Sequence, residues 1–289
     1  MTFNRNADVG DSSARKRGRG RGPVIAGGAG ALGVVVLLVS LLTGTDLTGF
    51  LGGGAGGGAA PESTQLEGCK TGADANGDDE CRLAAGQLAI DGYWERELDG
   101  YRPPQLIIVD GSTPSACGEA SNATGPFYCP PEEHIYVDET FWSILRERYG
   151  ADAGPLAQLY VLAHEYGHHV QQITGVMDRY PRTEAGADSN AVRVELQADC
   201  YAGAWVADAA TVEDDSGVPF LQEPTRQQVE DALEAAAAVG DDHIQGQAGR
   251  VDPETWTHGS SEQRQRWFIA GYEGGTRACD TFAPADGDL

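Results

Sequence analysis

Basic residues are scarce in this chain of 289 residues. It holds 20 lysines and arginines against 44 aspartates and glutamates. Six of the basic residues and only two acidic ones precede residue 45, so the remainder holds 14 basic and 42 acidic residues, a net charge of −28. A domain that acidic repels nucleic acid and anionic lipid headgroups, so we expect no nucleic-acid partner. Solubility is the simplest reason for the charge, and recruitment of a cationic partner is the alternative.

The sequence also has no C-x-x-C pair, which argues against a zinc site built from cysteines. An even number of cysteines instead favours disulfides in a compartment outside the cytoplasm. Fifteen pairings of six cysteines are possible. Short loops favour the pairs Cys69–Cys81 and Cys117–Cys129, which leaves Cys200 to pair with Cys279. The cysteines are Cys69, Cys81, Cys117, Cys129, Cys200 and Cys279.

The first sixty residues have the composition of a membrane-anchoring segment rather than of a folded domain. Residues 1–23 are predicted to be a basic cytoplasmic arm, and the uncharged run 24–44 is about long enough for a transmembrane helix. Residues 45–65 are predicted to be a Gly-rich linker, followed by a single domain at 66–289. We therefore expect a single-pass membrane protein with its N-terminus in the cytoplasm and its domain outside. A cleaved signal peptide and secretion are the alternative.

The rest of the chain predicts an α+β fold, with a small β-sheet followed by a mostly helical half. Residues 62–82 are interpreted as a loop bounded by cysteines, in which "DANGDDE" forms a solvated acidic turn; a calcium loop is the alternative. Strands are expected at 105–110 and 132–140. Helices are expected at 83–98, 139–150, 154–175, 190–209, 225–240 and 260–275, two of them with capping-box spacing at their start. There is no internal repeat, and strands followed by helices are typical of α+β domains.

One of these helices carries the sequence His164-Glu165-Tyr-Gly-His168. Helical residues four apart share a face, so the two imidazoles can bind one metal ion. Glu165 lies beside them and is placed to activate a water molecule rather than to bind the metal. This H-E-x-x-H pattern is typical of zinc peptidases, although alone it also occurs on ordinary surface helices. The apolar stretch before His164 predicts a buried helix, where unpartnered polar groups would be costly.

A catalytic zinc ion needs a third protein ligand. Glu195 and Asp199 are four residues apart on the expected helix 190–209. We expect Glu195 to complete a set of two histidines and one glutamate for Zn²⁺. Asp199 is expected to accept the outer N–H of His164; a simple salt bridge is the alternative. The branch of peptidases with a third histidine six residues after the second is excluded, because position 174 is Thr.

Longer stretches extend the pattern beyond these two helices. They include "CGEASNATGPFYCPPEEHIYVDETFW", "AHEYGHHVQ", "VRVELQADCYAGAW", "AAAAVGDDHIQ" and "THGSSEQRQRWFIAGY". Together they resemble the bacterial putative neutral zinc metallopeptidase family, over about 66–282. The resemblance implies a membrane-anchored or secreted zinc peptidase with a zincin-like fold. It also implies that His164, Glu165, His168 and Glu195 occupy the zinc and catalytic positions.

The expected reaction is hydrolysis of a peptide or protein substrate by water that zinc activates. Glu165 would take a proton from the water and pass it to the leaving amine. His258 is the candidate for stabilising the oxyanion, with Tyr201 and Tyr128 as rivals and a purely structural role as the alternative. The strand containing "HIYVD" could be a sheet edge that pairs with an extended substrate, or an ordinary buried strand.

Two other functions remain open at this point. One is a non-catalytic, zinc-stabilised scaffold that binds partners outside the cytoplasm. The presence of Glu165 argues against it, because a structural site gains nothing from a base beside an open position. The other is a zinc amidase that acts on cell-wall peptides. The residue pattern does not distinguish an amidase from a protein peptidase.

Overall fold

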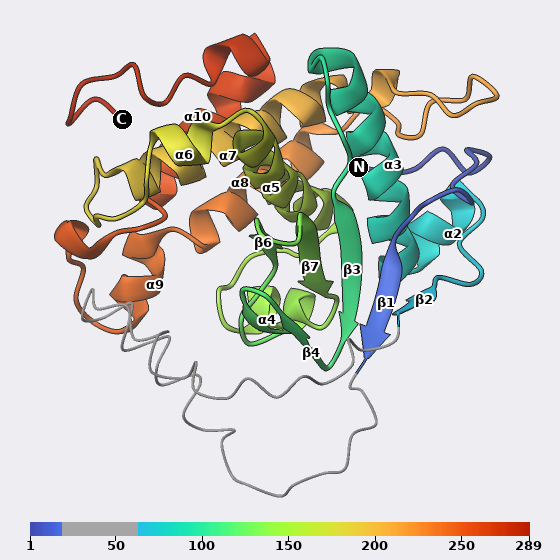
Figure 1. Ribbon diagram of the computed structural model, residues 1–289, viewed down its shortest axis with the longest axis horizontal. Helices are drawn as coiled ribbons and strands as arrows, with labels where there is room; N and C mark the ends of the chain where they lie inside the picture. Colours follow the sequence, from blue (N-terminus) through green and yellow to red (C-terminus); the bar gives the residue numbers. More distant parts are fainter. Residues whose placement is uncertain (19–62) are drawn as a thin grey trace, which may run out of the picture.

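A computed structural model describes residues 1–18 and 63–289 (Figure 1). The strands are β1 (Arg15–Gly18), β2 (Ser63–Gln65), β3 (Gln105–Asp110), β4 (Ser112–Ser115), β5 (Gly118–Ser121), β6 (Phe127–Cys129) and β7 (His134–Asp138). The α-helices are α2 (Gly72–Gly77), α3 (Asp79–Glu97), α4 (Phe141–Glu147), α5 (Pro155–Ile173), α6 (Val176–Arg179), α7 (Asn190–Asp208), α8 (Arg226–Ala238), α9 (Asp241–Gln247) and α10 (Ser261–Gly274). Short 3₁₀ helices are η2 (Ala209–Thr211), η3 (Pro253–Thr255) and η4 (Thr276–Ala278).

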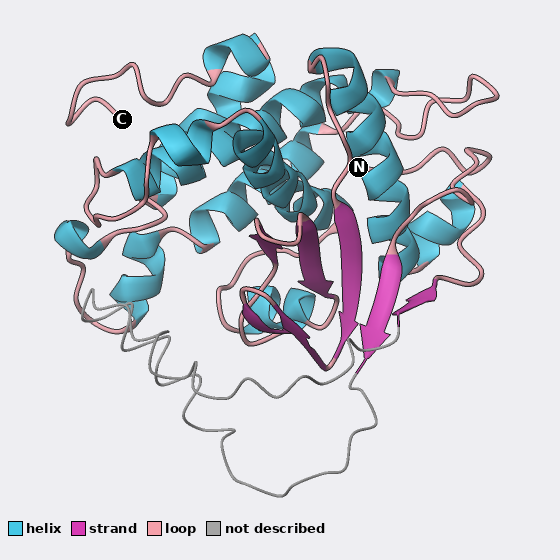
Figure 2. Cartoon of the chain, in the orientation of Figure 1, coloured by secondary structure: helices cyan, strands magenta, loops and turns pink. Residues whose placement is uncertain are grey.

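The five-stranded sheet has the order β2-β1-β3-β7-β6. Strands β1, β3 and β7 are parallel, and antiparallel β2 and β6 form the two edges. Strands β4 and β5 form a separate hairpin. The strands gather in one part of the molecule and helices make up most of the rest (Figure 2). The α+β expectation is confirmed.

Strand β3 is buried on both faces, as is usual for an interior parallel strand. Leu106 and Ile108 join the main core, which includes apolar side chains of α3 and α5. Ile107 and Val109 face a smaller cluster that contains Ala120 of β5. The main core therefore fixes α5 next to the sheet, and this helix carries the H-E-x-x-H sequence.

Helix α7 crosses both α5 and α10 with little space between the backbones. A Cβ atom at Gly167 of α5 would lie 2.9 Å from the Cα atom of Ala198 in α7. A Cβ atom at Gly271 of α10 would lie 1.9 Å from the carbonyl oxygen of Cys200 in α7. Only glycine fits at such approaches. The close crossings bring the polar side chains of the three helices to one place.

Residues 1–18 belong to this fold, which corrects the expectation that the first sixty residues lie outside it. Strand β1 is an interior strand between β2 and β3, and Phe3 and Val9 are fully buried. Lys16 forms an ion pair with Glu80 of α3. The basic composition of the segment suggested a cytoplasmic arm, but its few apolar residues are used in the core.

The expected membrane anchor at 24–44 lies outside the described residues. So does most of the expected linker at 45–65, although residues 63–65 form β2. Within residues 1–18 and 63–289, none of the helices combines the length and the apolar character needed to cross a membrane.

One further expectation was wrong. Residues 62–82 are not an irregular loop, because Thr71 and Asp74 form a capping box that begins α2, and Asp78 caps α3. Of the two alternatives for the strand containing "HIYVD", the structure shows the ordinary buried strand, because β7 pairs with β3 on one side and β6 on the other. It therefore has no free edge for a substrate strand.

The cysteines form three disulfides in the expected pairing. These are Cys69–Cys81, Cys117–Cys129 and Cys200–Cys279. The first two close loops of 12 residues, while the third joins α7 to the segment after α10 over 79 residues. Three closed disulfides indicate an oxidising compartment outside the cytoplasm.

Candidate metal centre

Helices α5 and α7 bring two imidazoles and one carboxylate together in the interior. His164 and His168 lie one turn apart on α5, and Glu195 faces them from α7. Glu195 Oε2 lies 3.2 Å from His164 Nε2 and 3.4 Å from His168 Nε2. All three residues are buried, and one ligand atom from each lies within 4.8 Å of the others.

These distances fit a tetrahedral zinc site. Zinc binds imidazole nitrogen and carboxylate oxygen at about 2.0–2.2 Å, which places neighbouring ligand atoms of a tetrahedron roughly 3.3–3.6 Å apart. The separation of 3.4 Å from Glu195 Oε2 to His168 Nε2 lies in this range, and that of 3.2 Å to His164 Nε2 lies just below it. The Nε2 atoms face the carboxylate, while the Nδ1 atoms bind other partners. The donor set therefore suits a zinc ion that would be held by His164, His168 and Glu195.

Asp199 fixes the orientation of His164. The Nδ1 atom of His164 lies 2.8 Å from Asp199 Oδ1, and the hydroxyl of Tyr160 donates to the same oxygen at 2.5 Å. Arg264 of α10 donates to both carboxylate oxygens, from Nε at 2.8 Å and from Nη2 at 2.9 Å. The hydrogen bond to a ligand histidine and the salt bridge, considered as alternatives from the sequence, occur together.

The buried charges of this network compensate one another. Burial alone would raise the pKa of Asp199, but the charges of Arg264 and His164 outweigh it and lower the pKa to about 2. Burial alone would lower the pKa of His164, but the charge of Asp199 and its hydrogen bond raise it to about 10. Burial would also raise the pKa of Glu195, yet the neighbouring imidazoles hold it well below its ordinary value. Without metal, the site is thus an ion-paired cluster.

Arg264 and Arg182 are two members of the site that sequence reasoning missed. Arg264 follows the predicted start of a helix by a few residues and belongs to no metal-binding pattern. Arg182 lies in the loop before α7, where its Nη1 atom is 3.2 Å from Glu195 Oε1. Its side chain is 42% exposed, whereas that of Arg264 is buried. Arg182 therefore connects the buried carboxylate to the solvent-facing side of the site.

Glu165 and His258 lie in different parts of the site. Glu165 is buried on α5, directly after His164. His258 lies in the loop before α10, and its side chain is 43% exposed. Buried Asp241 accepts hydrogen bonds from the backbone N–H groups of Thr257, His258 and Gly259 at 2.7–3.0 Å, and its Oδ1 lies 3.4 Å from His258 Nδ1. Burial would lower the pKa of His258, but Asp241 and Glu195 raise it above its ordinary value.

The two tyrosines considered as rivals of His258 are committed to packing. The Tyr128 hydroxyl lies 3.1 Å from Nδ1 of His169, whose Nε2 lies 2.7 Å from the carbonyl oxygen of Arg102. Tyr201 packs edge-on against Trp94. His169 is completely buried among these contacts, so its role is structural.

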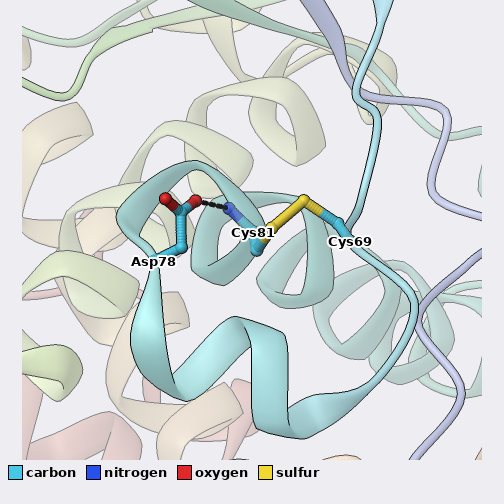
Figure 3. Close-up of side chains that lie close together, drawn as sticks. All are labelled: Cys69, Asp78 and Cys81. Carbon is cyan, nitrogen blue, oxygen red and sulfur yellow. Dashed lines mark hydrogen bonds between the residues drawn. A yellow bond between two sulfur atoms is a disulfide. The ribbon is translucent and has the colours of Figure 1, made fainter.

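A second group of potential metal ligands, formed by Cys69, Asp78 and Cys81, is not a metal site. Figure 3 shows that the two sulfur atoms are joined in a disulfide. The Asp78 carboxylate accepts a hydrogen bond from the backbone N–H of Cys81 at 2.9 Å and caps α3. Both sulfurs and the carboxylate therefore already have structural roles.

The geometry defines a candidate metal centre of the two-histidine, one-glutamate class. The chain matches the family described as putative neutral zinc metallopeptidase over residues 3–282, and it belongs to this family. It is 49% identical over 224 residues to Uncharacterized protein Rv2575 of Mycobacterium tuberculosis, covering 76% of each chain. It is 35% identical over 271 residues to Uncharacterized protein YpfJ of Escherichia coli, covering 89% of this chain and 88% of the relative. No solved structure matches the chain.

We expect zinc affinity to increase with pH. In the metal-free protein His164 holds an extra proton up to its pKa of about 10, and zinc binds only the deprotonated nitrogen. One released proton corresponds to an affinity change of about tenfold per pH unit between about pH 6 and pH 8. Competition with a chelator measures the affinity, and calorimetry in two buffers counts the protons.

The control for this experiment is Asp199→Asn, which removes the charge that raises the pKa of His164. This variant should release less proton on binding zinc at the same pH. An affinity that stays constant over the pH range, with no proton released by the parent, would contradict the assignment of His164 as an ion-paired ligand.

Proposed function

We propose that the protein is a zinc-dependent endopeptidase that hydrolyses peptide bonds with Glu165 as the general base. The observation that carries this proposal is the convergence of His164, His168 and Glu195, with Glu195 Oε2 at 3.2 Å and 3.4 Å from the two Nε2 atoms. Membership of the zinc metallopeptidase family supports it. The placement of the H-E-x-x-H helix beside a small sheet also supports a zincin-like fold.

Each side chain has a distinct role in this proposal. When bound, zinc supplies Lewis-acid chemistry, which acidifies water and polarises a carbonyl group. Glu165 accepts the proton of the attacking water and delivers it to the leaving amine. His164, His168 and Glu195 would hold the metal, and Asp199 keeps the His164 ring in its binding orientation.

His258 is the proposed stabiliser of the oxyanion. Its imidazole is partly exposed and therefore accessible to a substrate, while Asp241 holds both its backbone and its ring. The neighbouring Asp241 favours the charged imidazolium, which is the form that best stabilises developing negative charge. The rival tyrosines have their contacts elsewhere.

Glu165→Gln should retain zinc and lose hydrolytic activity by a factor of about 10²–10⁴, because the amide cannot accept a proton. Glu184→Gln, in the exposed loop near Arg182, is the matched control and should keep both zinc and activity.

His258→Ala should also retain zinc and lose activity by about 10²–10³. Zinc content and hydrolysis of casein and of cell-wall peptide fragments are measured side by side.

The outcomes distinguish the proposed function from its two rivals. Full activity of Glu165→Gln would refute its role as the base. Cleavage of wall fragments but not casein would favour the amidase. A zinc-containing parent that hydrolyses neither substrate class would favour the non-catalytic scaffold.

A further inference from the structure

The second zinc ligand of α5, His168, has its own fixed partner. Its Nδ1 atom lies 2.9 Å from Oε1 of Gln171, which is completely buried. The Nε2 atom of Gln171 donates to the carbonyl oxygen of Val194 at 2.7 Å and to Oε1 of Gln197 at 3.1 Å. Gln197 donates in turn to the carbonyl oxygen of Cys279 at 2.9 Å. Two amides thus connect the metal ligand to the Cys200–Cys279 disulfide.

The donor and the acceptor of every hydrogen bond in this series, from His168 to the Cys279 carbonyl, are determined by the backbone carbonyls that it contains. A backbone carbonyl only accepts, so Gln197 must present its NH₂ group to Cys279 and its oxygen to Gln171. Gln171 must then present its NH₂ group to Gln197 and Val194, which leaves its oxygen for His168. That oxygen also only accepts, so His168 must carry a hydrogen on Nδ1. In the neutral ring, the Nε2 lone pair is consequently left free for a metal.

The Cys279 carbonyl, the last acceptor in this series of hydrogen bonds, lies in a segment that is tied to α7. Cys279 is joined to Cys200 of α7 by the disulfide. Thr281 and Arg193 of α7 exchange hydrogen bonds: the Thr281 hydroxyl donates to the Arg193 carbonyl at 2.7 Å, and Arg193 Nη1 donates to the Thr281 carbonyl at 2.7 Å. The Cys279 carbonyl therefore has little freedom to move away from Gln197.

We propose that Gln171 is a positioning residue that fixes the tautomer and ring orientation of His168, and that Gln197 and the Cys279 carbonyl fix Gln171. This proposal rests on the proposed zinc site. It assigns to His168 the kind of support that Asp199 gives to His164. One ligand histidine is thus held by a charged group and the other by a neutral amide.

Gln171→Met removes the acceptor while keeping the volume of the side chain. It should weaken zinc binding about 10–100-fold, and Gln197→Met should weaken it in the same direction by less, because Val194 still orients Gln171. Gln158→Met is the matched control. Gln158 is a buried glutamine on the same helix, bonded to Arg82 and to the Ala153 carbonyl instead. This control should bind zinc like the parent.

Two readouts separate positioning from general damage. Zinc affinity is measured by chelator competition on variants whose folding is checked by circular dichroism. The visible spectrum of the cobalt-substituted protein reports ligand geometry and should change in Gln171→Met but not in Gln158→Met. Unchanged zinc affinity in a folded Gln171→Met would overturn the proposal. A parent that binds no zinc would instead refute the proposed function.

A separate observation concerns the two ends of the undescribed segment 19–62. Strand β1 ends at Gly18 and β2 begins at Ser63, and the two strands pair in antiparallel register, with Arg17 opposite Ser63. On its other side β1 pairs in parallel with β3. The backbone N–H of Asn4 also donates to the Phe220 carbonyl at 2.9 Å. Residues 1–18 are therefore bound to distant parts of the domain.

We infer that residues 1–18 lie in the same compartment as residues 63–289 and remain part of the folded protein. A single membrane crossing within 24–44 would place them on opposite sides of the membrane. Cleavage of a signal peptide after this run would remove β1, which would leave β3 paired only with β7 and β2 without a partner strand. The pairing of β1 therefore argues against a single crossing that separates the two parts and against loss of residues 1–18 by cleavage.

The test uses the full chain and a cysteine pair across two paired strands. Arg15 and Gln65 are register partners in β1 and β2. Arg15→Cys with Gln65→Cys, in a chain that also carries a protease site between residues 45 and 60, should form a disulfide during export. After protease cleavage, the two fragments should stay joined without reductant and separate with it. Arg15→Cys alone is the control and should give separate fragments.

Fragments that separate without reductant would contradict the inference if the Arg15→Cys thiol also reacts with a cytoplasmic probe. Absence of residues 1–18 from the exported protein, read by mass spectrometry, would overturn it as well. The described residues contain no free cysteine, so the native thiols do not compete for the new pair.

Discussion

The structure depends on the close approach of α5 and α7 around a set of buried charges. His164, Glu195, Asp199 and Arg264 are all largely removed from water. Isolated charges in the interior would be very costly, so each must have a partner of opposite sign or a metal ion. The glycines at the helix crossings allow the close approach of the helices. The ion pairs offset the free-energy cost of burying the charges that this approach encloses. The close packing of the helices and the pairing of the buried charges at the candidate metal centre therefore depend on each other.

The two sides of the centre are built differently. On the His164 side, Asp199, Tyr160 and Arg264 form a charged network that links α5, α7 and α10. On the His168 side, neutral amides lead to the segment that the third disulfide ties to α7. The solvent-facing side holds Arg182 and His258, whose side chains are both partly exposed. This arrangement separates the buried groups that orient His164 and His168 from the partly exposed Arg182 and His258.

The sequence predicted the parts of the fold that local patterns determine. The helices with caps and the buried strand β3 were found because apolar periodicity and capping residues are local signals. Strand β1 was missed because a short basic strand becomes recognisable only through its partner β3, about ninety residues later in the chain. Strand β7 was predicted, but its interior position depends on the pairing of β6, which no local pattern reveals.

The same distinction holds for the site. The pattern of His164, His168 and Glu195 could be predicted because helical spacing brings such residues onto facing surfaces. Arg264, Arg182 and Gln171 could not, because each enters the site through tertiary packing and none belongs to a spaced motif. The direction of the Gln171 hydrogen bonds, in particular, is determined by a backbone carbonyl of a distant segment.

The zinc content of the purified full-length protein tests the metal centre most directly. The protein is isolated from an oxidising compartment beside Glu195→Ala, and zinc per chain is counted after excess metal is removed. We expect about one zinc ion per parent chain and much less in the variant, because two histidines alone leave the tetrahedral set incomplete. A well-folded parent that takes up no zinc when it is offered would mean that the buried cluster is only an ion-pair network.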